Sequence, residues 1–281
     1  MNTMLILTDF SENAFRAMEY AASLTQPLQT SRIILYHAFQ SFIFGTELPI
    51  TNTPDNERLY LECMENLALQ QDRLRALIHA GIRIDMKAED ALLADHINDF
   101  CAEENVDFIV MGVSGKSGLE KLLLGSTTSL IISTSKVPVL VVPKDTIIGK
   151  PLTSIIFTTD LKHHETIPVE RLHEILRAFP ATVRVLNVEK GAGTEKYVIE
   201  TKESIASLHE IFEPYHASFD YLNDNNTVDG ILAYSNQHQA SLIIVIPRKQ
   251  GGLAVLFHNS ISKKLAYDSN IPLLCLPPAD K

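Results

Sequence analysis

The feature that most constrains the fold is an alternation of short apolar segments with longer amphipathic segments, which occurs twice along the chain. In the first half, candidate strands rich in aliphatic and β-branched residues lie at residues 4–8, 32–38, 82–87, 107–111 and 138–142. Candidate helices separate them, at residues 11–25, 56–79, 91–104 and 125–135. Strands that alternate with helices in this way form a parallel sheet with helices on both faces, so the order predicts an α/β fold.

The second half repeats the same order. Its candidate strands lie at residues 153–158, 182–188, 217–221, 242–246 and 272–276, and its candidate helices at 168–178, 195–213, 228–239 and 260–269. Ser126 and Ser260 are separated by 134 residues, and so are Pro138 and Pro272. We therefore expect two tandem Rossmann-like domains, residues 1–145 and 151–281, each with a five-stranded parallel sheet.

The second copy is shorter in its middle. Asp9 and Asp160 are separated by 151 residues, so about 17 residues are missing between the start and the end of the second copy. We expect the missing piece to be the loop at residues 39–54, which reads FQSFIFGTELPITNTP.

A glycine-rich segment follows the fourth candidate strand. Gly115-Lys116-Ser117 resembles part of a P-loop, but the first P-loop glycine is replaced by Val110, which excludes that motif. The pattern that remains is G-x2-G-x9-G-[ST], formed by Gly112, Gly115, Gly125 and Ser126. It lies at the carboxyl end of a strand and at the start of a helix, where parallel α/β sheets bind ligands and free N–H groups attract phosphate. A tight turn without a ligand is the alternative explanation.

This pattern, with LTDFSENA at the first strand end and SKVPVLVVPK as the last strand, resembles the universal stress protein family. The resemblance covers both halves and implies the adenine nucleotide alpha hydrolase-like fold and an ATP-binding subtype. It implies that Asp9 contacts the ribose and the adenine edge, that the Ala38 backbone contacts adenine, and that the glycine segment binds ribose and phosphates. The family often has proline at the Leu7 position and valine at the Ala38 position, and both replacements leave backbone contacts available. The implied site comprises Leu7, Asp9, Ala38, Met111, Gly112, Val113, Gly115, Lys116, Gly125, Ser126 and Thr127.

The second copy has lost most of this pattern. Ile246, Lys249 and Asn259 replace the three glycines, whereas Asp160 and Ser260 are retained. A side chain at each glycine position would fill space that phosphates need, so the second domain is expected to be degenerate and structural. A phosphate contact from Lys249 is the alternative.

The resemblance further implies that the final strands of the two halves, residues 138–142 and 272–276, pair antiparallel as an intrachain pseudo-dimer; a homodimer is left open. The leading function is a nucleotide-dependent stress or signalling protein that uses ATP, with or without Mg²⁺, and has a protein partner. The alternatives are a scaffold protein that uses no nucleotide and a weak ATPase. No catalytic residue is assigned, because the chain lacks a G-x-S-x-G or Cys/His signature.

Composition limits the other classes. The net charge is −10, and an acidic chain without a basic cluster is a poor candidate for binding nucleic acid or an anionic membrane. Three scattered cysteines fit a reducing cytoplasm, and no apolar run approaches the roughly 18 residues of a membrane span. His163 and His164 follow Asp160 without metal-ligand spacing and are expected to be polar surface. Glu89 and Asp90 are expected to begin the third helix.

Overall fold

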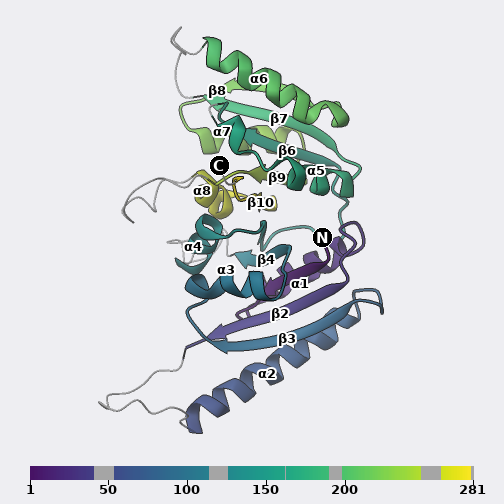
Figure 1. Ribbon diagram of the computed structural model, residues 1–281. Coiled ribbons are helices and arrows are strands. Elements are labelled where there is room, and N and C mark those ends of the chain that lie inside the picture. Colours follow the sequence, from purple (N-terminus) through teal and green to yellow (C-terminus); the bar gives the residue numbers. More distant parts are fainter. Residues whose placement is uncertain (41–53, 114–125, 162, 190–197, 248–260, 280–281) are drawn as a thin grey trace, which may run out of the picture.

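The structure, a computed structural model, describes residues 1–40, 54–113, 126–161, 163–189, 198–247 and 261–279 (Figure 1). The elements of the first half are β1 (Thr3–Leu7), α1 (Glu12–Leu24), β2 (Arg32–Phe39), α2 (Pro54–Arg75), β3 (Arg83–Asp90), α3 (Leu93–Glu103), β4 (Phe108–Val113), α4 (Ser126–Thr134) and β5 (Val139–Pro143). The elements of the second half are β6 (Ser154–Thr159), the 3-10 helix η1 (His164–Thr166), α5 (Val169–Ala178), β7 (Thr182–Glu189), α6 (Val198–Phe212), the 3-10 helix η3 (Glu213–Tyr215), β8 (Ser218–Asn223), α7 (Thr227–Gln237), β9 (Leu242–Val245), α8 (Ile261–Asp268) and β10 (Leu273–Cys275).

All ten strands join one sheet, in the order β3-β2-β1-β4-β5-β10-β9-β6-β7-β8, which runs from one end of the molecule to the other (Figure 1). The strands are parallel within each half, and β5 and β10 pair antiparallel through Leu274 and Leu140 at the centre of the register. The predicted α/β class and the predicted antiparallel pairing of the last strands are both confirmed. The pairing also covers two strand edges that would otherwise be exposed.

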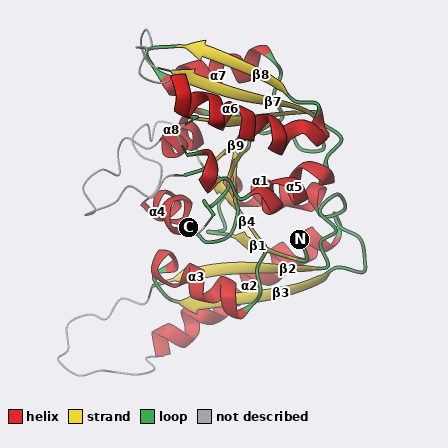
Figure 2. Ribbon diagram, turned by 45° about the horizontal axis from the view of Figure 1, so that its top comes forward, coloured by secondary structure: helices red, strands yellow, loops and turns green. Residues whose placement is uncertain are grey.

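The sheet has one hydrophobic layer on each face, and each layer continues from one half into the other. On one face, side chains of β1, β2, β6 and β7 pack against α1, α2, α5 and α6. On the other face, α3, α4, α7 and α8 cover the sheet. Figure 2 shows these helices on the strands of both halves. The pair of β5 and β10 is the seam between the two halves. Because both hydrophobic layers continue across this seam, the two halves share their core.

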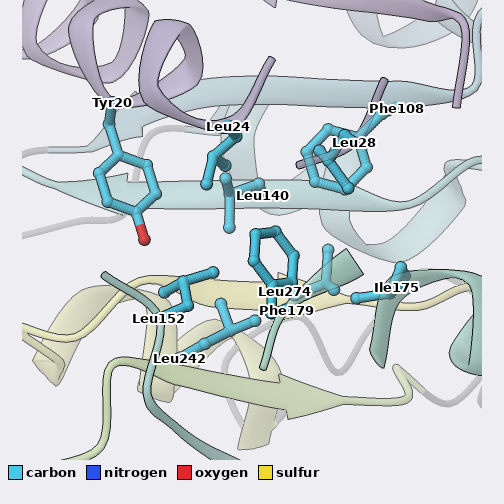
Figure 3. A pocket seen from close by; sticks show the side chains of 10 residues that line it. All are labelled: Tyr20, Leu24, Leu28, Phe108, Leu140, Leu152, Ile175, Phe179, Leu242 and Leu274. Carbon is cyan, nitrogen blue, oxygen red and sulfur yellow. The ribbon is translucent and has the colours of Figure 1, made fainter. Parts of the chain in front are cut away.

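A small apolar void lies at this seam, between α1 of the first half and α5 of the second (Figure 3). Its volume is about 10 Å³, near the minimum for one water molecule, and a water there would need polar partners. The void is therefore a packing defect and too small for a ligand. Its lining comprises Tyr20, Leu24, Leu28, Phe108, Leu140, Leu152, Ile175, Phe179, Leu242 and Leu274.

The shortening of the second copy involves the connection after its second strand and the helix that follows. The connection from strand to helix is indeed shorter, because α6 begins at Val198 soon after β7 ends at Glu189, whereas Phe39 and Pro54 bound the corresponding segment in the first half. However, the helix is shorter too: α2 has 22 residues and α6 has 15. The shorter connection agrees with the predicted missing loop, and among the described residues the helix that follows is shorter as well.

Candidate functional site

The carboxyl ends of β1, β2 and β4 bring several of the expected site residues to one edge of the sheet. β1 lies between β2 and β4, and the chain changes direction across the sheet at β1 and β4. Such a switch point is where open parallel sheets bind ligands. Leu7 ends β1, Asp9 follows it, and Ala38 lies near the end of β2. The end of β4 contributes Met111, Gly112 and Val113.

The remaining expected residues belong to the segment after β4. Ser126 and Thr127 form the first turn of α4. Gly115, Lys116 and Gly125 lie outside the described residues. The structure therefore brings the expected residues at the strand ends together and shows where α4 begins. Ligand contacts by these residues stay a prediction.

Asp9 lies in a turn that needs support, because Phe10 has a left-handed backbone with φ of 63°. This conformation costs a non-glycine residue roughly 1–2 kcal/mol. The Thr8 hydroxyl accepts a hydrogen bond from the Phe10 N–H at 3.0 Å. The Thr8 carbonyl oxygen lies 2.8 Å from His37 Nδ1, and the His37 and Phe10 rings are 4.3 Å apart. The side chains of Thr8 and His37 thus stabilise the turn that carries Asp9.

Asp9, whose side chain is exposed, lies shortly before the start of α1. Asp9 Oδ1 accepts a hydrogen bond from the Ser11 N–H at 3.0 Å. The Ser11 hydroxyl caps α1 by accepting from the Ala14 N–H at 3.2 Å, as its position before the helix predicts. The site therefore has a carboxylate that accepts a hydrogen bond from the Ser11 N–H, next to a helix start.

Gly112 has a packing role that the sequence did not reveal. A Cβ at this position would lie 2.3 Å from the Asn13 carbonyl oxygen and 2.6 Å from the Asn13 carbonyl carbon. Glycine therefore lets β4 approach the first turn of α1 closely. The group that approaches Gly112 on this side is protein backbone, and a ligand contact by Gly112 stays a prediction.

We predict that Gly112→Ala destabilises the chain by about 3 kcal/mol, because backbone atoms rather than a flexible side chain must move to admit the methyl group. Urea unfolding followed by circular dichroism measures the change. Gly81→Ala is the matched control, since a Cβ at Gly81 meets nothing within 4 Å and should change stability by no more than about 0.5 kcal/mol. Equal effects of the two substitutions would contradict this role of Gly112.

The second half has the same strand order but a different helix start. After Asp160 the chain forms η1 before α5 begins at Val169, whereas α1 begins at Glu12, soon after Asp9. Pro168 at the start of α5 makes no side-chain cap. Ile246, at the Gly112 position, packs against the hydrophobic layer. Lys249, Asn259 and Ser260 lie outside the described residues.

The prediction for Glu89 and Asp90 is wrong. Both residues end β3, where they pair with Ala38 and Phe39 of β2, and α3 begins later, at Leu93. Glu89 Oε2 accepts a 2.8 Å hydrogen bond from the Tyr36 hydroxyl. It also lies 3.3 Å from Nε2 of His96. Burial, reinforced by the bond to Glu89, raises the pKa of Tyr36 well above its usual value, so this tyrosine is a neutral donor at physiological pH.

The two histidines after Asp160 make separate polar contacts. His163 Nδ1 lies 4.0 Å from Asp160 Oδ2, and His164 Nδ1 lies 3.0 Å from the hydroxyl of the buried Ser204. His164 is thus more than the polar surface residue expected. In the part of the chain that the structure describes, no group of three or more His, Cys, Asp and Glu side chains is arranged to bind a metal ion.

The three cysteines are free and buried. Burial raises the pKa of Cys101 to about 12, so its thiol is not nucleophilic at neutral pH. Along the described ranges, no helix combines the length and apolar character needed to cross a bilayer.

Sequence reasoning missed Thr8, Phe10 and His37 as residues that shape the site. A usable signal lay in the internal repeat, because Thr-Asp is followed by a bulky apolar residue at both strand ends, Phe10 in the first half and Leu161 in the second. Leu161 also has a φ of 63°. A turn that occurs in both copies is required by the fold, and the side chains that support it follow from that requirement.

Comparison with known proteins agrees with this architecture. The sequence profile described as the Universal stress protein family matches residues 1–143. The chain is 41% identical over 64 residues to a universal stress protein of Methanocaldococcus jannaschii; the match covers 23% of this chain and 38% of that protein, well under two thirds of its length. It is 26% identical over 145 residues to the universal stress protein YxiE of Bacillus subtilis, which covers 50% of this chain and 98% of YxiE.

Solved structures include chains with a similar fold over both halves. The crystal structure of a universal stress protein from Archaeoglobus fulgidus DSM 4304 matches with a TM-score of 0.74 and 21% identity, covering 98% of each chain. This similarity supports the ten-stranded arrangement as a fold that occurs elsewhere. The family profile covers more than half of the 281 residues, and the chain belongs to the universal stress protein family.

Proposed function

We propose that the protein binds an adenine nucleotide, ATP in the first instance, in residues 1–145, and acts in a stress response or in signalling. The observation that supports this most directly is the convergence of Asp9, Ala38 and Gly112 at one switch point, where three neighbouring strands end. The G-x2-G-x9-G-[ST] segment leads from this edge into the start of α4. Free N–H groups at a helix start favour phosphate, and an exposed carboxylate at Asp9 suits the hydroxyls of a ribose.

Residues 151–281 are proposed to be a structural partner without a nucleotide. Two differences support this assignment. Ile246 replaces Gly112 and contributes its side chain to the hydrophobic layer. The helix after Asp160 begins later and without a side-chain cap. Both changes remove features that place backbone donors near the switch point in the first half.

A hydrogen bond connects α1, which lies beside the candidate site, with the segment that leads to the second half. α1, which begins beside Asp9, carries Arg16, whose Nε donates a 2.9 Å hydrogen bond to the carbonyl oxygen of Lys144. Lys144 follows β5, the strand that pairs with the second half. A nucleotide that shifts the start of α1 would therefore act on the connection between the halves and on the surface offered to a protein partner.

A second candidate is a scaffold protein that uses no nucleotide. The packing of Gly112 against Asn13 favours it, because the fold requires this glycine even when no ligand is bound. The two candidates differ in whether the chain retains or rebinds a nucleotide.

The test is to purify the full chain, denature it, and identify the released small molecules by mass spectrometry. We expect an adenine nucleotide, either carried through purification or rebound when the emptied protein is dialysed against ATP. A parallel preparation of Asp9→Ala should carry and rebind much less. A wild-type chain that neither retains nor rebinds adenine nucleotide would favour the scaffold candidate. A separate assay for phosphate release determines whether bound ATP is hydrolysed.

A further inference from the structure

The turn that follows the first strand is built in the same way in both halves, but with a different side-chain donor. In the first half, His37 Nδ1 lies 2.8 Å from the Thr8 carbonyl oxygen. In the second half, Asn187 Nδ2 donates a 2.9 Å hydrogen bond to the Thr159 carbonyl oxygen. Thr159 pairs directly with Asn187 in the sheet, and Thr8 and His37 are the residues that follow the paired Leu7 and Tyr36.

The rest of the turn is also shared. Thr8 and Thr159 each accept a hydrogen bond at the hydroxyl from the N–H two residues later, at 3.0 Å and 3.2 Å. The donors are Phe10 and Leu161, which have the same left-handed φ of 63°. An aspartate lies between threonine and the left-handed residue in both copies.

The halves differ beside this turn, at Gly112 and Ile246, so the turn is retained where the neighbouring strand end has diverged. What both copies keep is a side-chain N–H donor on the carbonyl that precedes the aspartate. At this position the strand ladder ends, because the backbone turns away, and both carbonyl oxygens lie in partly buried positions where the lack of a donor is unfavourable. The fold therefore requires a donor from the second strand of each half.

His37 meets this requirement with a defined protonation pattern. A carbonyl oxygen can only accept, so the proton must be on Nδ1 of the imidazole. The ring also packs on Phe10, the left-handed residue, at a centroid distance of 4.3 Å. One side chain thus fixes both residues that flank Asp9.

We propose that His37 is a positioning residue for the nucleotide site: its Nδ1–H and its ring hold the Thr8–Phe10 turn so that the Asp9 carboxylate points to the ligand. The inference rests on the proposed function, because it assigns to Asp9 a ligand contact. In the second half Asn187 holds the equivalent turn, but there the turn serves the fold and no nucleotide site.

The test uses three variants of the full chain, titrated with ATP by calorimetry and checked for folding by circular dichroism. His37→Ala removes the donor and should weaken ATP binding about tenfold or more. His37→Asn supplies the amide donor that the second half uses and should bind within about threefold of the wild type. Asn187→Ala is the matched control: it removes the equivalent bond in the second half and should leave ATP affinity unchanged even where it lowers stability.

Each outcome decides the proposal. His37→Ala that binds ATP like the wild type in a folded protein would overturn it, as would His37→Asn that binds as weakly as His37→Ala. An affinity loss in Asn187→Ala equal to that in His37→Ala would show general destabilisation instead of positioning.

If His37→Ala does not fold, nitrogen NMR of the wild-type imidazole decides: protonated Nδ1 is expected, and a neutral ring with its proton on Nε2 would refute the bond. A wild-type chain that binds no adenine nucleotide would refute the proposed function, while the NMR result would still report on the turn.

Discussion

Replacing Leu274 with aspartate should strongly destabilise the whole chain. Leu274 is 1% exposed and lies in β10, where it pairs with Leu140 of β5 and with Ile244 of β9. It belongs to the hydrophobic layer that continues through both halves. A carboxylate at this position would be buried among aliphatic side chains without a partner, which costs several kcal/mol or forces the group to take up a proton.

We expect the free energy of unfolding to fall by about 4 kcal/mol or more, a large part of the roughly 5–15 kcal/mol that stabilises a typical domain. Because the layer is shared, both halves should lose their structure together. Urea unfolding monitored by circular dichroism measures the effect. Leu77→Asp is the matched control, since Leu77 is 49% exposed and its replacement should change stability by no more than about 0.5 kcal/mol. A Leu274→Asp protein as stable as the control would mean that the seam does not unite the two halves.

The second large effect concerns the number of nucleotides that one chain binds. We predict one, bound in the first half, and a second half that stays empty at concentrations that saturate the first. The first half has the capped start of α1 beside Asp9, and Gly112 lies at the end of β4, one residue before Val113. In the second half α5 begins later, and the Ile246 side chain occupies the equivalent strand end.

The difference should be large because several contacts change together. Each lost hydrogen bond to a nucleotide costs roughly 1 kcal/mol or more, and about 1.4 kcal/mol corresponds to tenfold in affinity. Losing two or three contacts would therefore weaken binding about thirtyfold to a hundredfold or more. Asp160→Ala should consequently leave ATP binding unchanged, whereas Asp9→Ala should remove most of it.

The repeat in the sequence was sufficient to predict most of the fold. Strand and helix order follow from local apolar periodicity, and the pairing of β5 with β10 follows from the resemblance combined with the duplication. The boundary of β3 could not be predicted, because Glu89 and Asp90 are added to the strand by pairing with β2. Pairing partners lie far away in the sequence, and charged residues give no local strand signal.

The position of the candidate site residues at strand ends could be predicted, but the contacts that hold them there could not. Asp9 and Gly112 were expected at strand ends, where ligand sites in this architecture lie, and the structure places both at one edge of the sheet. The need for glycine at position 112 comes from the Asn13 backbone, which only tertiary packing brings there. The support that His37 gives to Thr8 likewise depends on the register of two strands.

We propose that one half of this duplicated chain binds the nucleotide and that the other half supports it. The most direct test is calorimetric titration of the full-length wild-type chain with ATP, which gives the number of bound molecules per chain. We predict one ATP per chain, with the same number and affinity for Asp160→Ala and with binding largely lost for Asp9→Ala. Two equivalent ATP molecules per chain, or binding that survives in Asp9→Ala and disappears in Asp160→Ala, would contradict this assignment.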